Sequence, residues 1–124
     1  MQEINNVQQP QQLIRGGIYI VNLPNSRGSI QSKQRPCVLV SNNACNRFSP
    51  VLHMCPLSSV ATKAKLPTHI AISRNNNGLI RDSIALCEQV MPVTKSSVGI
   101  QVGICSEVDM KRIGKGIAIQ LGIS

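Results

Sequence analysis

Acidic and aromatic side chains are both scarce in this chain of 124 residues. Five Asp and Glu stand against 13 Lys and Arg, which gives a formal net charge of +8. Such an excess favours polyanionic partners, because electrostatic attraction and counterion release both promote binding. The aromatic residues are only Tyr19 and Phe48, so a binding mode that stacks several bases on aromatic rings has little to work with. Recognition of a nucleic acid would depend on phosphate contacts and hydrogen bonds.

The sequence also lacks the patterns of metal sites, disulfide frameworks and membrane spans. It has no Cys-x-x-Cys, and its five cysteines lie mostly within apolar runs, which indicates buried thiols in a reducing compartment. His53 and Cys55 share a face of an expected strand, but without nearby partners they favour packing over zinc. No apolar run approaches membrane length, and no charged start precedes an apolar block. We therefore expect a cytoplasmic protein with no membrane contact, metal or cofactor.

Short β-branched runs separated by turn residues dominate the middle of the chain. The length fits one domain, and we expect a loose Gln/Asn-rich extension at 1–13 followed by a single domain at 14–124. The runs predict strands at 18–23, 37–42, 51–57, 68–73 and 83–93. Short strands at this spacing indicate a small, strongly curved sheet or barrel.

Helix signals are concentrated at the C-terminal end. Ser106 and Asp109 form a capping-box-like start for a helix. Its apolar positions recur at spacings of three and four at Met110, Ile113, Ile117 and Leu121. The pattern predicts a terminal helix packed on the barrel. Residues 58–65 could form two helical turns, and 74–83 is expected to be a turn with positive φ at Asn77 or Gly78.

A basic residue stands at the start of one apolar run. Pro36 restricts Arg35 to extended backbone angles, which places the Arg35 guanidinium at the rim of the sheet. On this evidence alone, Arg35 is either a solvated cation or an anion-binding group. The connection at 24–35 carries Gly, Ser and Gln beside Arg27 and Lys33, so it is the best candidate for a binding loop.

Six segments carry a resemblance to a known family: "RGGIYIVNL", "RGS", "QRPCVLVSNN", "NRFSP", "KAKLPTH" and "RDSIALCEQV". In their order and spacing, from about Arg15 to Val90, the sequence resembles the MazF/PemK-type toxins of bacterial type II toxin-antitoxin systems. The resemblance implies a mainly β fold, a small SH3-like barrel of about five to seven strands with a C-terminal α-helix. It also implies a homodimer that cleaves single-stranded RNA at short motifs without a metal and is neutralised by a cognate antitoxin.

The resemblance places the family's functional arginine on Arg35 and its hydroxyl residue on Ser58. RNA supplies its own nucleophile, the 2′-hydroxyl, so the protein must mainly stabilise charge. A guanidinium suits the dianionic transition state and is a poor proton acceptor, which assigns electrostatic stabilisation to Arg35. Ser58 would donate a hydrogen bond to the phosphate or order the 2′-hydroxyl. On local sequence, a helix N-cap at Ser58 is an equally good interpretation.

Further RNA contacts are expected from seven polar and basic residues, namely Arg27, Ser29, Gln31, Lys33, Lys63, Lys65 and Gln89. The expected basic groove could also hold an acidic antitoxin tail. It passes Arg27, Lys33, Arg35, Lys63 and Lys65. Three positions depart from the family pattern. Gly17 replaces the aspartate of an Arg-Gly-Asp that commonly opens the first strand, which changes local anchoring more than chemistry. Ile30 replaces a glutamate and removes a carboxylate, and Ser58 replaces a threonine and loses the methyl group that stiffens χ1. These departures predict reduced or redirected activity.

Other titratable groups are given structural interpretations. His53 and His69 could form a ribonuclease-type pair, but hydrogen-bonded sheet histidines are favoured. Glu88 is expected to share a strand face with Ile84 and Leu86 and to bind a basic partner at a dimer interface or a base edge. Two other functions stay open: a non-catalytic toxin-fold module that binds a protein such as gyrase, and a plain RNA-binding module.

Overall fold

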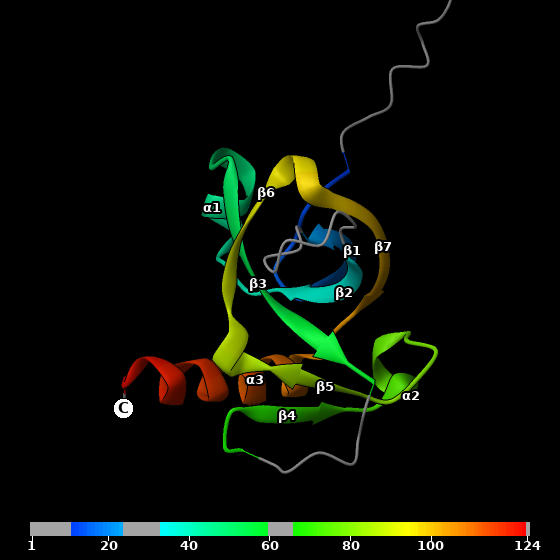
Figure 1. Cartoon of the computed structure of the whole chain (residues 1–124), viewed down its shortest axis with the longest axis vertical. Helices are drawn as coiled ribbons and strands as arrows, with labels where there is room; N and C mark the ends of the chain where they lie inside the picture. Colours follow the sequence, from blue (N-terminus) through cyan, green and yellow to red (C-terminus); the bar gives the residue numbers. More distant parts are fainter. Residues whose placement is uncertain (1–10, 24–32, 60–65, 124) are drawn as a thin grey trace, which may run out of the picture.

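The computed structural model describes residues 11–23, 33–59 and 66–123. These residues form an antiparallel sheet with the strand order β4-β5-β3-β2-β1-β7, and β6 pairs with β3 beside it. The strands are β1 (Gly17–Leu23), β2 (Lys33–Leu39), β3 (Val51–Ser58), β4 (His69–Ile72), β5 (Ser83–Leu86), β6 (Met91–Thr94) and β7 (Val98–Ile104). They curl into a roughly barrel-like shape (Figure 1), which confirms the expected mainly β fold.

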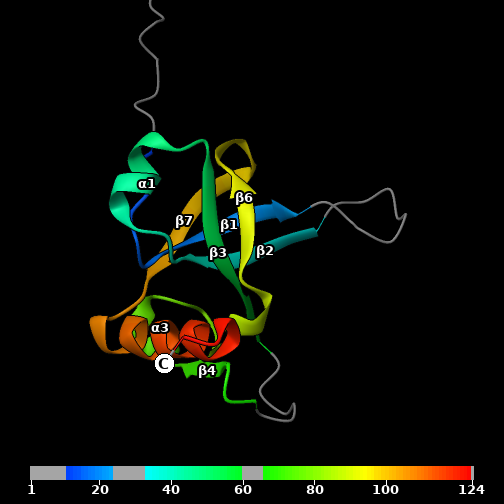
Figure 2. The ribbon, with the colours of Figure 1, turned by 90° about the vertical axis from the view of Figure 1, so that its left-hand side faces the viewer.

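The helical elements are short, apart from the last one. They are α1 (Asn43–Phe48), α2 (Arg74–Asn77), the 3₁₀ helices η2 (Cys87–Gln89) and η3 (Lys95–Ser97), and α3 (Glu107–Leu121). Figure 2 shows α3 and β4 at one end of the molecule and α1 at the other. Among the described residues, no helix is both long and apolar enough to span a membrane.

The three central strands are buried on both faces, because they serve two separate apolar clusters. Alternate residues of β1 divide between them: Ile18 packs into a helix-side core with Ile113 of α3, and Tyr19 packs into a β6-side core with Val93. In β2, Val38 and Leu39 divide in the same way. This double burial explains why the expected strands appear in the sequence as continuous apolar runs.

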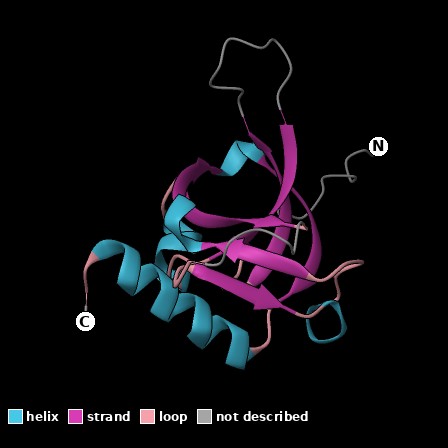
Figure 3. Ribbon diagram, turned by 60° about the horizontal axis from the view of Figure 1, so that its bottom comes forward, coloured by secondary structure: helices cyan, strands magenta, loops and turns pink. Residues whose placement is uncertain are grey.

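The predicted terminal helix is confirmed, together with its cap. The Ser106 side chain accepts a hydrogen bond from the Asp109 backbone N–H at 3.1 Å. Met110 and Ile113 are buried as expected, whereas Leu121 is 59% exposed. The last turn of α3 extends beyond β4 and β5, as Figures 1 and 3 show, so the prediction for Leu121 is wrong.

Several element boundaries differ from those expected. The run at 83–93 is two strands interrupted by η2, and the run at 37–42 is strand only to Leu39. Asn42 ends that run, because its side chain accepts a hydrogen bond from the Cys45 N–H and starts α1. The expected turn at 74–83 contains α2, followed by Gly78 at φ 75°. The helical turns proposed at 58–65 fall largely outside the described residues.

The cysteines lie largely as expected. Cys37, Cys55, Cys87 and Cys105 are buried free thiols, and Cys45 is exposed. Burial raises the pKa of Cys105 to about 12, with the nearby Asp109 charge acting in the same direction. Buried, protonated thiols of this kind act as apolar packing groups.

Candidate functional site

A cleft opens where β2 and β3 separate. The pairing of these strands includes Cys37 with Pro56, and the same register continued would place Arg35 opposite Ser58. That pair does not form, and at this point β3 is paired along its other edge, where Ser58 lies opposite Ile84 of β5. The space left between the diverging strands measures about 760 Å³ and is called the Arg35 cleft below.

The Arg35 cleft is lined by apolar, polar and cationic side chains together. Its described lining residues are Ile20, Gln34, Arg35, Pro36, Leu57, Ser58, Ser59, Gly78, Leu79, Ile80, Arg81, Ser83 and Val102. None of them is acidic. The volume lies within the range of roughly 300–1,000 Å³ that is typical of ligand sites. A cleft of this composition suits an anionic ligand that also carries apolar surface.

Arg35 enters the cleft from β2, where it pairs with Val21 of β1. The side chain is half-buried. Among the described residues, ion pairs join His69 to Glu88 and Arg112 to Asp109, and no carboxylate pairs with Arg35. Because a guanidinium keeps its charge at any ordinary pH, Arg35 brings a positive charge to the cleft wall.

Ser58 enters the cleft from the end of β3 and is also half-buried. The two residues expected to carry the chemistry therefore line one cleft, although they lie on different strands. The alternative interpretation of Ser58 as a helix cap concerns residues 60–65, which lie outside the described part of the chain.

The wall contributed by residues 78–83 was not anticipated as part of the site. Arg81 lines this wall and is exposed. Two hydrogen bonds anchor the chain at and just after Arg81: the Ser83 hydroxyl donates to the Arg81 carbonyl at 3.1 Å, and the Arg74 backbone N–H donates to the Asp82 carboxylate at 3.0 Å. The signal available in the sequence was the "RDS" segment within the family resemblance, but no spacing rule links it to Arg35.

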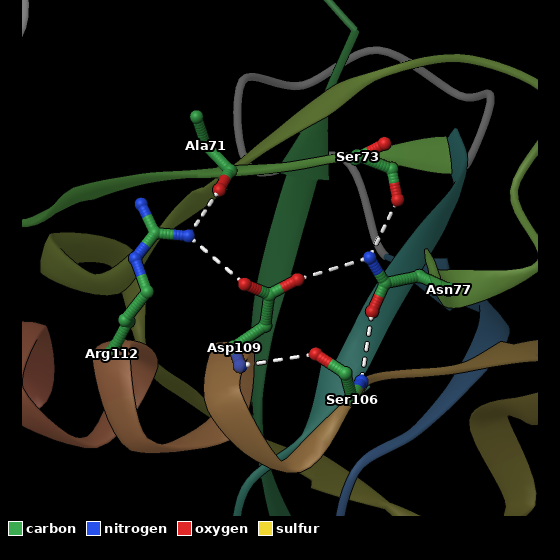
Figure 4. A network of polar contacts seen from close by, with 6 residues as sticks. All are labelled: Ala71, Ser73, Asn77, Ser106, Asp109 and Arg112. Carbon is green, nitrogen blue, oxygen red and sulfur yellow. Dashed lines mark hydrogen bonds and ion pairs between the residues drawn. The ribbon is translucent and has the colours of Figure 1, made fainter. Parts of the chain in front are cut away.

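A buried polar network fixes the start of this wall (Figure 4). Asn77 is 1% exposed, and its amide nitrogen donates to Asp109 Oδ2 at 3.1 Å. Its amide oxygen accepts from the Ser106 backbone N–H at 3.0 Å, and Arg112 pairs with the other Asp109 oxygen at 3.0 Å. The network therefore joins the end of α2 to the first turn of α3, directly before Gly78 enters the cleft wall.

The two histidines lie outside the cleft lining. His53 is exposed on β3, and the His69 ring on β4 contacts Glu88 Oε2 at 2.9 Å, as expected for a sheet histidine. The predictions for Glu88 need correction: it lies in η2, and its basic partner is in the same chain. The reason is that η2 interrupts the expected strand and turns Glu88 toward β4.

The pKa of Glu88 reflects opposing effects. Burial acts to raise it, but hydrogen bonds from His69, from the backbone and from Thr68 outweigh burial and hold the pKa below its ordinary value. The Thr68 hydroxyl donates to Glu88 Oε1 at 3.1 Å. Both carboxylate oxygens are thus used within the chain.

The expected RNA-contacting residues are only partly described. Gln89 is exposed in η2 and does not line the Arg35 cleft, and the Lys33 backbone pairs with Leu23 at the start of β2. Arg27, Ser29, Gln31, Lys63 and Lys65 lie outside the described residues, as does Ile30. Within 11–23, 33–59 and 66–123, no group of three His, Cys, Asp or Glu side chains could hold a metal ion.

The curved sheet with its terminal helix defines a MazF-type toxin fold. A chain of the MazE–MazF complex of Deinococcus radiodurans (Form-II) matches it with a TM-score of 0.76 and 18% sequence identity, covering 92% of this chain and 99% of that one. An endoribonuclease from a mycobacterial species, solved in complex with its cognate antitoxin, matches with a TM-score of 0.69 and 23% identity, covering 91% and 96%.

Sequence comparison identifies the family. Residues 14–121 match the PemK-like, MazF-like toxins of type II toxin-antitoxin systems, and the chain belongs to this family. The Endoribonuclease MazF of Staphylococcus saprophyticus is 32% identical over 109 residues, which cover 88% of this chain and 91% of that protein.

Proposed function

We propose that this protein is a sequence-selective endoribonuclease, the toxin of a toxin-antitoxin pair, which cleaves single-stranded RNA in the Arg35 cleft. One observation carries the proposal: Arg35 and Ser58, from two diverging strands, line the same cleft. The S. saprophyticus relative, named an endoribonuclease, supports this chemistry. The net charge of +8 supports a polyanionic substrate.

The reaction uses groups that the RNA itself supplies. The 2′-oxygen attacks the adjacent phosphorus, the bond from phosphorus to the 5′-oxygen breaks, and the products end in a 2′,3′-cyclic phosphate and a 5′-hydroxyl. The 2′-hydroxyl loses its proton, and the leaving oxygen gains one. Arg35 stabilises the charge that develops on the non-bridging oxygens through forked N–H donors. The Ser58 hydroxyl donates to the phosphate or orders the 2′-hydroxyl.

Two protein partners belong to the same proposal. A cognate antitoxin with an acidic segment would compete with RNA for the basic cleft, and the mycobacterial relative solved with its antitoxin supports this. A second copy of this chain would cover exposed aliphatic side chains near the end of α3. These are Ile119, Leu121 and Ile123, which are 54–61% exposed.

The direct test incubates the purified protein with a defined single-stranded RNA, with and without a chelator. We expect chelator-resistant fragments that end in 2′,3′-cyclic phosphate. Arg35→Ala should lower the cleavage rate about a hundredfold to a thousandfold, as for loss of one preorganised oxyanion donor. Lys111→Gln removes an exposed charge on α3 and serves as the matched control.

The same experiment separates the alternatives. RNA that is bound but left intact would favour a plain RNA-binding module, and RNA that is neither bound nor cut would favour a protein-binding toxin. If Arg35→Ala remained folded and cut RNA at the parent rate, the proposed role of Arg35 would be wrong.

A further inference from the structure

Arg81 gives the Arg35 cleft a second positive charge from a separate part of the chain. Arg35 comes from β2, and Arg81 comes from the connection between α2 and β5. Among the described residues, no carboxylate forms an ion pair with Arg81, and the described cleft lining contains no acidic side chain. The cleft therefore holds two cations, neither of which forms an ion pair with a described acidic side chain.

The backbone around Arg81 is anchored and its side chain is exposed. The Ser83 hydroxyl donates to the Arg81 carbonyl. On the other side of Arg81, the Arg74 side chain donates from Nη1 to the Ile80 carbonyl at 3.5 Å. The adjacent Asp82 carboxylate accepts the Arg74 backbone N–H. This arrangement fixes the origin of the Arg81 side chain on the cleft wall, and the guanidinium stays accessible to a ligand.

An apolar surface accompanies the two charges. Ile20, Leu79 and Val102 line the cleft together with the two arginines, and Ile80 beside Arg81 is 86% exposed. A free phosphate ion would leave this apolar surface without a partner. An RNA strand presents phosphates at regular intervals, with a ribose and a base between them, and so matches both features of the cleft.

We propose that Arg81 binds a phosphate next to the scissile one, so that the cleft holds two successive phosphates of the RNA strand. This inference rests on the proposed endoribonuclease function and adds a substrate-positioning residue to it. Arg81 contacts a phosphate whose bonds do not change in the reaction. Its contribution is therefore equal in the ground state and the transition state, and it lowers KM without raising kcat.

The first test measures binding of a non-cleavable 2′-O-methyl RNA as a function of salt concentration. Arg81→Gln should reduce the slope of log K against log salt by about 0.7, the value for one phosphate contact on a single strand. Arg81→Lys keeps the charge and should retain the parent slope, as should the control Lys111→Gln. An unchanged slope in Arg81→Gln would overturn the inference.

The second test measures cleavage kinetics of the same variants on cleavable RNA. Arg81→Gln should raise KM roughly tenfold, with kcat within about twofold of the parent value. A fall in kcat at unchanged KM would overturn the inference, because it would mean that Arg81 acts in the chemical step.

The two proposals fail in different ways. If the parent protein neither binds nor cuts RNA, the endoribonuclease function fails and the role of Arg81 fails with it. Another outcome is that the parent cuts RNA and Arg35→Ala cuts it far more slowly, while Arg81→Gln has the salt slope and the KM of the parent. In that case only the proposed role of Arg81 is wrong.

Discussion

Two prolines stand where the Arg35 cleft opens. Pro36 follows Arg35 on β2, and Pro56 lies opposite Cys37 on β3. Neither residue has a backbone N–H, and in this register the donor missing at Pro36 is one that would otherwise face β3 where the two strands separate. The sequence could place Arg35 at the start of a strand through Pro36. That Arg35 and Ser58 line the same cleft depends on the register of β2 and β3, which no local sequence pattern specifies.

Ser58 carries a prediction at the residue scale. Ser58→Thr keeps the hydroxyl and adds a methyl group that restricts χ1, so the hydroxyl should be aimed more consistently. We expect the single-turnover cleavage rate to rise about twofold to tenfold. This corresponds to a fall of up to about 1.4 kcal/mol in the activation free energy. Ser58→Ala should lower the same rate. Equal rates for all three proteins would support a capping role for Ser58.

At the scale of elements, the join between α2 and α3 determines where one wall of the cleft lies. The α3 start was predictable because its cap is local, with Ser106 three residues before Asp109. The partner on α2 was not predictable, since Asn77 and Asp109 are 32 residues apart. A close approach completes the join: a Cβ atom at Gly103 of β7 would collide with the Asn77 carbonyl oxygen. Only glycine fits at this position without movement of the backbone.

Asn77→Ala tests the join. The change removes the side-chain donor to the Ser73 carbonyl and to Asp109, and it leaves the Ser106 N–H without its acceptor. We expect the free energy of unfolding to fall by about 3 kcal/mol, measured by urea denaturation, because buried polar groups lose their partners. Gln120→Ala on the exposed face of α3 is the control. A loss below about 0.5 kcal/mol, the level of ordinary surface changes, would contradict the assigned role.

At the scale of the whole molecule, the barrel-like sheet and its terminal helix followed from the order of apolar runs and turns. The edge strand β7 was missed because its side chains lack a clear alternation, with Ile100 70% exposed. The break at η2 was missed because Cys87 continues an apolar run; in the fold its thiol points to the Ile113 carbonyl of α3 at 3.6 Å. Tertiary packing decided both features, and local pattern did not.

The ionisation of Glu88 makes the stability of the folded protein depend on pH. Because its pKa in the folded protein lies below the ordinary value of 4.5, its stabilising contribution is present above that pH. The contribution is lost as the pH falls through the folded-state pKa. We expect Glu88→Gln to lower Tm at pH 6–7 and to differ less from the parent near pH 3. Thermal unfolding of both proteins between about pH 3 and pH 7 measures this Tm difference.

Glu107→Gln provides the comparison for this experiment, because Glu107 is an exposed acid on α3. Its Tm difference from the parent should be smaller than that of Glu88→Gln at neutral pH, because Glu107 contributes only an exposed charge in the first turn of α3. If the Tm difference for Glu88→Gln were the same at every pH, the negative charge of Glu88 would not be the source of the stabilisation.

The double burial of β1, β2 and β3 means that neither half of the molecule can come apart alone. Loss of the helix-side core would expose Ile18 and Val38, and the same strand segments hold the β6-side core in place. Unfolding should therefore occur in one cooperative step. A partly opened form that keeps the Arg35 cleft intact would not accumulate, so each molecule either has the complete cleft or lacks it altogether.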